Sequence, residues 1–292
     1  MNSQIVDSGN KNIDDFIKET QFSSKKEFLI WVPYENFTNV EHIGKGGFSE
    51  IYKATWEKQI YKTNQKIFKT EMTEVVLKVL NDSQNVDTEF FKELKYTYQF
   101  GSGYKIYTIQ CHGVTQIPKT KNYAFILEYA KNRNLHHFIH KNFETFTWNN
   151  KIKYLNDIIG GIKKIHDQKI IHRDLHSGNI LVTRSAYYKL IISDLGFSQP
   201  ASIGSGKSQI YGIIPYMAPE LFKNQPYSYA SDIYSLGMIM WQLTSGHRPF
   251  HDQEHGPKLI LNILDGKRPE ITEDTPERWV NLMKRCWHPD PS

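Results

Sequence analysis

The chain has 292 residues, of which 39% are hydrophobic and 13% aromatic, so it carries enough apolar material for a large buried core. Its net charge of +5 comes from basic residues interleaved with acidic ones, without a run of three Lys or Arg, and this argues against a nucleic-acid partner. No apolar stretch approaches the roughly 20 residues that span a bilayer, and the N-terminus lacks a secretory signal, so we expect a cytoplasmic protein.

The first part of the chain is predicted to be a leader followed by a sheet with one helix. Residues 1–37 are mostly polar and end in an aromatic patch, which predicts a loose leader whose last part docks. In 87–99, Phe90, Leu94 and Tyr98 recur at helical spacing and predict a helix with one apolar face. Five strands are expected, at 40–43, 50–56, 74–79, about 106–115 and 123–129.

The second part of the chain is predicted to be mainly helical. Apolar residues step by three and one from Ile152 to Ile165, with Thr147 as a plausible N-cap, so a long buried helix is expected. A second helix of this kind is expected at about 230–244. The change from strand-rich to helix-rich sequence near residue 130 predicts two lobes joined by a short connection.

The strongest chemical signal is the segment 172–179, HRDLHSGN, which matches the catalytic-loop pattern H-R-D-L-x-x-x-N. Five specified positions at about 1 in 20 each make a chance match on the order of 10⁻⁴ over the chain. At this motif the sequence resembles the eukaryotic protein kinase domain, and its end, at 285–291, favours the tyrosine-kinase-like group of that family. The resemblance implies an α+β, bilobal protein kinase fold over 38–292, with a small antiparallel N-lobe at about 38–127 and a larger, mainly helical C-lobe at about 131–292.

Two upstream elements resemble the phosphate-binding parts of that family. The segment 43–51 looks like the glycine-rich loop, in which Gly44 and Gly46 would let backbone amides approach phosphate oxygens, although alone it would be read as a simple hairpin turn. Lys78 ends a strand in a V-L-K sequence that resembles V-A-I-K, and would contact the α and β phosphates of ATP. Its partner would be Glu93, with Glu89 as the less favoured candidate.

By family position, the adenine would lie between apolar side chains from both lobes, and its edge would contact backbone groups of the segment that connects the lobes. Each of these apolar residues could equally be plain core. The positions that the resemblance assigns to nucleotide binding, besides the glycines and Lys78, are Ile43, Ile51, Val76, Glu128, Ala130 and Leu181.

Downstream, the family positions imply a base, two magnesium ligands and several structural residues. Asp174 would accept or orient the proton of the substrate hydroxyl. Asp194, in a D-L-G version of the D-F-G element, and Asn179 would each hold a Mg²⁺ ion, because Mg²⁺ prefers oxygen ligands. The residues with implied structural or regulatory roles are His172, Arg173, Glu220 of the A-P-E element, and Asp232, which would brace the catalytic loop.

The sequence indicates the substrate specificity less clearly than the reaction. Tyr216 before the A-P-E element resembles serine/threonine kinases, whereas His176 replaces the lysine that those kinases usually carry, and the segment 285–291 resembles tyrosine-kinase-like enzymes. We therefore predict transfer of the ATP γ-phosphate to Ser or Thr of protein substrates in intracellular signalling, with a tyrosine or dual-specificity kinase as the alternative. A pseudokinase that binds ATP without transfer is a distant alternative, because the charged and amide residues that transfer requires are all present. They are Lys78, Glu93, Asp174, Asn179 and Asp194.

Two further expectations concern regulation and the chain end. A phosphate on Ser202, Ser205, Ser208 or Tyr211 would pair with the arginine of the catalytic loop, although each of these four is individually more typical of an ordinary loop residue. The family usually continues to an arginine that pairs with the A-P-E glutamate, so we expect that the domain is truncated at Ser292 and less stable than a longer form.

Overall fold

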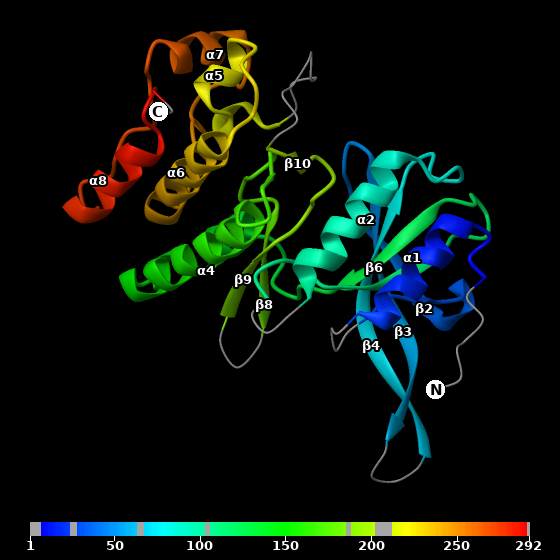
Figure 1. Ribbon diagram of the computed structural model, residues 1–292. Helices are drawn as coiled ribbons and strands as arrows, with labels where there is room; N and C mark the ends of the chain where they lie inside the picture. Colours follow the sequence, from blue (N-terminus) through cyan, green and yellow to red (C-terminus); the bar gives the residue numbers. More distant parts are fainter. Residues whose placement is uncertain are drawn as a thin grey trace. The chain divides into compact units, whose positions relative to one another are not determined.

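The structure is a computed structural model that describes residues 7–23, 28–62, 67–102, 106–184, 188–201 and 212–290. The chain divides into two compact units, Met1–Tyr129 and Ala130–Ser292. Strands dominate the first unit and helices the second (Figure 1). The expected α+β class is confirmed.

The first unit is built on one mixed sheet of six strands in the order β1-β5-β6-β4-β3-β2. Only β1 pairs in parallel, with β5, and the other neighbours are antiparallel. The strands are β1 Ile30–Trp31, β2 Phe37–Lys45, β3 Ser49–Lys62, β4 Ile67–Leu80, β5 Cys111–Gln116 and β6 Tyr123–Glu128. The helical segments are α1 Lys11–Phe22, η1 Tyr34–Asn36 and α2 Thr88–Gly101.

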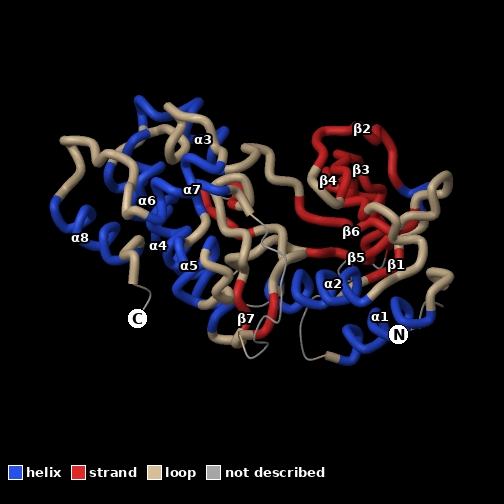
Figure 2. Tube along the Cα trace, turned by 90° about the horizontal axis from the view of Figure 1, so that it is seen from above, coloured by secondary structure: helices blue, strands red, loops and turns tan. Residues whose placement is uncertain are grey.

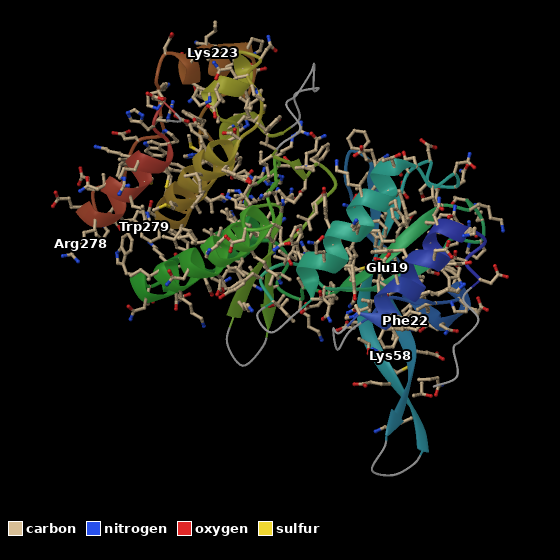
Figure 3. The ribbon with its side chains drawn as sticks, in the orientation of Figure 1. Glu19, Phe22, Lys58, Lys223, Arg278 and Trp279 are labelled. Atoms are coloured by element: carbon tan, nitrogen blue, oxygen red, sulfur yellow. The ribbon has the colours of Figure 1, made fainter. Side chains whose placement is uncertain are left out.

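The β3–β4 hairpin is longer than its sequence pattern indicated. Both strands have 14 residues and pair along their whole length, from Ser49 opposite Leu80 to Lys62 opposite Ile67. Because β2 pairs with β3 only as far as Trp56, the rest of the hairpin projects as a two-stranded ribbon (Figure 1), with Lys58 near its base (Figure 3).

One face of this sheet forms the core of the first unit. Successive side chains of a strand point to opposite faces, so Ala54, Val75 and Leu77, each at most 1% exposed, share the buried face. Trp56 and Phe37 complete this cluster with tilted rings 6.4 Å apart. The other face carries Lys78, which leads to the site described below.

The second unit is mainly helical, with two short two-stranded sheets among its described residues. Helix α6 is buried along nearly its whole length and packs against α4 and α8. The helical segments are α3 Leu135–Asn142, η2 Phe143–Thr145, α4 Trp148–His166, η3 Ile214–Tyr216, α5 Pro219–Phe222, α6 Tyr229–Ser245, α7 Pro257–Leu264 and α8 Glu277–Cys286. The strands are β7 Ile170–Ile171, β8 Ile180–Arg184, β9 Tyr188–Ile192 and β10 Gln199–Pro200, of which β8 pairs with β9 (Figure 1) and β7 pairs with β10.

The helices that the sequence predicted are confirmed. α2 and α6 match the expected ranges within two residues at each end, and Thr147 caps α4 by accepting a hydrogen bond from the N–H of Asn150. α6 ends at Gly246 with φ 80°, a left-handed conformation that favours glycine. The expectation of a loose leader is wrong for α1, which the structure shows as a capped helix. Among the described residues, no helix combines the length and apolarity needed to cross a membrane.

Candidate active site

The glycine-rich segment is the turn between β2 and β3. The Gly46 N–H donates to the carbonyl of Ser49 at 2.8 Å, and this closes the turn. Phe48, at its tip, is 61% exposed. Gly44 lies opposite Ile51 in the β2–β3 register, just after an irregularity in the pairing. The backbone amides of this turn are therefore not obstructed by bulky side chains at Gly46 and Gly47.

Lys78 and Glu93 form a buried ion pair within the first unit. The Nζ of Lys78 on β4 lies 2.6 Å from Oε1 of Glu93 on α2, and each side chain is only 9% exposed. The expected pairing with Glu93 is present, whereas Glu89 is exposed and pairs with Lys92 at 3.3 Å. α2 begins at Asp87, whose side chain accepts from the N–H of Phe90 and fixes the start of the helix that carries Glu93.

Two apolar positions expected at the nucleotide share the sheet face of Lys78. Ile51 is directly opposite Lys78 in the β3–β4 register, and Val76 lies two residues before Lys78. Directly opposed residues of antiparallel strands point to the same face, so Ile51, Val76 and Lys78 lie together. Ile51 and Val76 are half-buried, in contrast to the fully buried residues of the other face, and Ile43 is 46% exposed.

The catalytic-loop segment is held mainly through Asp232 of α6. This carboxylate is 1% exposed and accepts hydrogen bonds from the N–H of His172 at 2.8 Å and of Arg173 at 3.0 Å. Nε2 of His166 also donates to it, at 2.7 Å. Arg173 has φ 72°, a strained conformation for a residue with a side chain. The three donors on Asp232 hold the backbone in this conformation immediately before Asp174.

His172 links the loop to the segment after β9. Its Nδ1 accepts from the N–H of Asp174 at 3.3 Å, so the ring hydrogen is on Nε2, which donates to the carbonyl of Ser193 at 3.1 Å. The Arg173 guanidinium stacks over the ring of Tyr227 at 4.3 Å. The ring of His172 therefore bridges the two loops.

Asn179 orients the side chain of Asp174. Its Nδ2 donates to the carbonyl oxygen of Asp174 at 2.9 Å and to Oδ2 at 3.1 Å. His176 also lies beside this carboxylate, with Nε2 3.6 Å from Oδ2. Nδ1 of His176 accepts from the N–H of Gly178, so Nε2 carries the hydrogen. Asp174 is thus flanked by two donors and remains 13% exposed.

Asn179 and Asp194 lie at the same end of the β8–β9 hairpin. Asn179 precedes β8 and Ser193 follows β9, and the carbonyl of Asn179 accepts from both the N–H and the Oγ of Ser193, at 2.8 and 3.0 Å. Asp194 has φ 59°, and its Oδ1 accepts from the N–H of Gly196 at 3.4 Å. Leu195 between them is fully buried, as expected of an apolar residue in this element. The hairpin therefore presents a carboxylate and an amide oxygen at one end.

The remaining predicted positions are placed as follows. Leu181 is half-buried on β8, between the fully buried Ile180 and Val182. The N–H of Glu128 donates to the carbonyl of Gln110 at 3.0 Å, and the carbonyl of Ala130 accepts from the N–H of Arg133 at 3.0 Å. Glu220 is 8% exposed and accepts from Oγ of Ser231 at 3.2 Å.

A family model described as protein tyrosine and serine/threonine kinase matches residues 37–292. The chain belongs to this family. A probable serine/threonine-protein kinase of Dictyostelium discoideum is 26% identical over 90% of this chain and 14% of its own length. A putative serine/threonine-protein kinase/receptor of Acanthamoeba polyphaga mimivirus is 27% identical over 94% of the chain and 16% of its own length. The rat mitogen-activated protein kinase kinase kinase 12 is 26% identical over 93% of the chain and 28% of its own length.

These matches confirm the identification of a protein kinase domain of the tyrosine-kinase-like type. The chain spans less than a third of each of these three relatives. ATP is the phosphate donor that the family implies, typically with Mg²⁺.

Some supporting contacts of this kinase domain were not found by sequence reasoning. His166, which pairs with Asp232, was not singled out at all. Tyr216 was noted only for its resemblance to serine/threonine kinases, but its hydroxyl donates to Oε1 of Gln242 at 2.7 Å and lies 3.1 Å from Oγ of Ser177. Burial raises the pKa of Tyr216 to about 12, so the hydroxyl keeps its hydrogen at neutral pH. The signal for His166 was its place at the end of a helix just before the catalytic loop, but its partner is 66 residues away.

The candidate phosphorylation sites lie outside the described residues. They are Ser202, Ser205, Ser208 and Tyr211. Their proposed pairing with the catalytic-loop arginine therefore stays a prediction.

Proposed function

We propose that this kinase domain transfers the γ-phosphate of ATP to Ser or Thr hydroxyls of protein substrates, with Asp174 as the group that orients the hydroxyl. The observation that carries the proposal is the geometry around Asp174: its carboxylate is held by Nδ2 of Asn179, and its backbone is fixed by Asp232 through the neighbouring residues. Phosphoryl transfer depends on positioning and charge stabilisation more than on covalent chemistry, so a rigidly held carboxylate is the element that it requires.

The donor atoms present fit magnesium. Nδ2 of Asn179 is engaged by Asp174, which leaves its side-chain oxygen for a cation, and Asp194 adds a carboxylate at the same hairpin end. Mg²⁺ prefers such oxygen ligands and, when bound, would offset the negative charge of the phosphates. We therefore assign Asn179 and Asp194 as the magnesium ligands.

Each remaining residue has a role within its own unit. Lys78, fixed by Glu93, would hold the α and β phosphates, and Gly44 and Gly46, which have no side chains, would let the backbone of the turn approach them. Asp174 would accept the hydroxyl proton as the oxygen attacks phosphorus. The apolar contacts and backbone groups assigned to the adenine are Ile43, Ile51, Val76, Glu128, Ala130 and Leu181.

Three wider assignments accompany this proposal. The names of the similar proteins support Ser/Thr specificity over Tyr. We propose a cytoplasmic kinase domain at 38–292, with a lobe boundary between 127 and 131, preceded by an N-terminal leader at 1–37. We also propose that the domain acts on a protein substrate and has no nucleic-acid partner.

The test is Mg²⁺-dependent ³²P transfer from γ-labelled ATP to peptides that contain Ser, Thr or Tyr. The whole chain is compared with Asp174→Asn and with the matched control Asp167→Asn, an exposed carboxylate paired with Lys163 on the surface. We expect label on Ser or Thr that is lost only in Asp174→Asn. Label on Tyr would indicate a tyrosine kinase, and a folded chain that binds ATP without transfer would indicate a pseudokinase.

A further inference from the structure

The described residues 8–23 and 28–32 precede the kinase family match and are anchored at several points of the first unit. β1 pairs in parallel with β5, with Ile30 opposite Gly113, and the N–H of Val32 donates to the carbonyl of Val114. At the other end of the segment, the hydroxyl of Tyr123 donates to the carbonyl of Ser8 at 2.9 Å. We call residues 8–23 and 28–32 the N-terminal segment.

Helix α1 of this segment has one strongly buried face. Ile13 and Ile17 are fully buried, and Phe16 and Thr20 are 7% and 3% exposed. The side chain of Asn10 caps the helix by accepting from two backbone N–H groups. The spacing of three and four residues between these buried positions is that of a single helix face. This face is therefore the one that packs on the kinase domain.

The partner of this face is α2. The ring of Phe16 lies 5.2 Å from Phe91 and 6.0 Å from Tyr98, both in edge-on arrangements. Oγ of Ser23 at the end of α1 lies 3.2 Å from the Tyr98 hydroxyl. Figures 1 and 2 both show α1 running alongside α2.

The contacts with α1 lie on the side of α2 opposite the ion pair. Successive residues of a helix are rotated by about 100°, so Phe91 and Tyr98, seven apart, point the same way. Glu93 is two residues after Phe91, about 200° away, and points to the other side. α2 is thus held between Lys78 on one side and Phe16 on the other.

We propose that the N-terminal segment is an intramolecular brace that holds α2 where Glu93 meets Lys78, and that Phe16 is a positioning residue for phosphate transfer. The inference deepens the proposed function and rests on it. Loss of the brace lets α2 sample positions in which Lys78 lacks Glu93, and turnover falls with the population of the paired state.

The test compares Phe16→Ala with Phe22→Ala in the whole chain. Phe22 is the same residue type on the same helix but is 89% exposed (Figure 3), so it controls for the change in helix propensity and the loss of an aromatic ring. Phe16→Leu is the conservative variant. The readouts are kcat and KM for peptide, and hydrogen–deuterium exchange of the α2 amides, which does not depend on activity.

For Phe16→Ala we expect kcat about tenfold lower, unchanged KM for peptide, and α2 amides that exchange about tenfold faster. Phe16→Leu should regain only part of both, so that its α2 amides still exchange faster than in the parent chain, and Phe22→Ala should match the parent chain. In a Glu93→Gln background, Phe16→Ala should lower kcat no further, because both act through one ion pair.

Additive losses in the double variant, or slow α2 exchange in Phe16→Ala, would overturn the brace. If Phe16→Ala does not fold, Phe16→Leu decides: faster α2 exchange than in Phe22→Ala supports the proposal, and equal exchange refutes it. A parent chain without any transfer would instead refute the proposed function, while the exchange comparison would still report on the brace.

Discussion

Replacing Glu93 by Gln removes one charge of the pair that fixes Lys78. The ammonium and carboxylate are 2.6 Å apart and both side chains are 9% exposed, so the remaining charge would be buried beside a neutral amide. Removing one partner of a buried pair typically costs about 3–5 kcal/mol. Because the amide oxygen of Gln still accepts a hydrogen bond, we expect a loss near the lower end of that range.

The matched control is Glu89→Gln on the same helix. Glu89 is 67% exposed and lies 3.3 Å from Lys92, so its pair should contribute only about 0–1 kcal/mol. Urea denaturation measures both stabilities. For turnover, a Lys78 that is displaced by about 1 Å should lower kcat about 100-fold in Glu93→Gln, whereas Glu89→Gln should leave it unchanged.

The reasoning is refuted if Glu93→Gln and Glu89→Gln lose similar stability and similar turnover. A stability loss without a fall in kcat would also count against it. In that case the pair would contribute to packing of α2 and not to the position of the lysine.

Two further predictions concern stability. Burial lowers the pKa of His112 to about 4, below its ordinary 6.5, so the unfolded chain binds the proton more readily than the folded chain does. The free energy of unfolding is therefore unaffected above pH 6.5 and falls by up to about 3 kcal/mol as the pH drops to 4. Thermal melts should show that His112→Gln loses this acid sensitivity, whereas the exposed-site control His137→Gln keeps it. Tyr216→Phe removes the donor to buried Gln242 and should lower the free energy of unfolding, measured by urea denaturation, by about 1–3 kcal/mol. The exposed-site control Tyr229→Phe should change it little, and equal losses would contradict the role of that hydrogen bond.

The sequence predicted the parts of the structure that depend on local pattern. The α2 helix follows from the spacing of Phe90 and Leu94, and the α4 helix from its apolar period with Thr147 as its cap. The reacting groups were identified through motif positions, because phosphate transfer requires fixed residue types at Asp174 and Lys78. Their roles stay predictions until the transfer assay is done.

The sequence did not predict elements whose stability comes from distant partners. α1 has buried residues at Ile13, Phe16, Ile17 and Thr20, a helical spacing, but its many polar residues masked that pattern. The outer half of the β3–β4 ribbon was missed because its pairing is set by the partner strand and not by an apolar alternation.

Motif residues differ from the residues that hold them in place in how strictly the residue type is fixed. Asp174 must be an aspartate for its chemistry, whereas any buried acceptor that reaches the two backbone N–H groups would hold the loop as Asp232 does. The same is true of Phe16, since many apolar residues can pack on α2. A support is therefore recognisable only from its contacts, and in this chain Phe16, which contacts the helix that carries Glu93, lies in a segment outside the kinase family match.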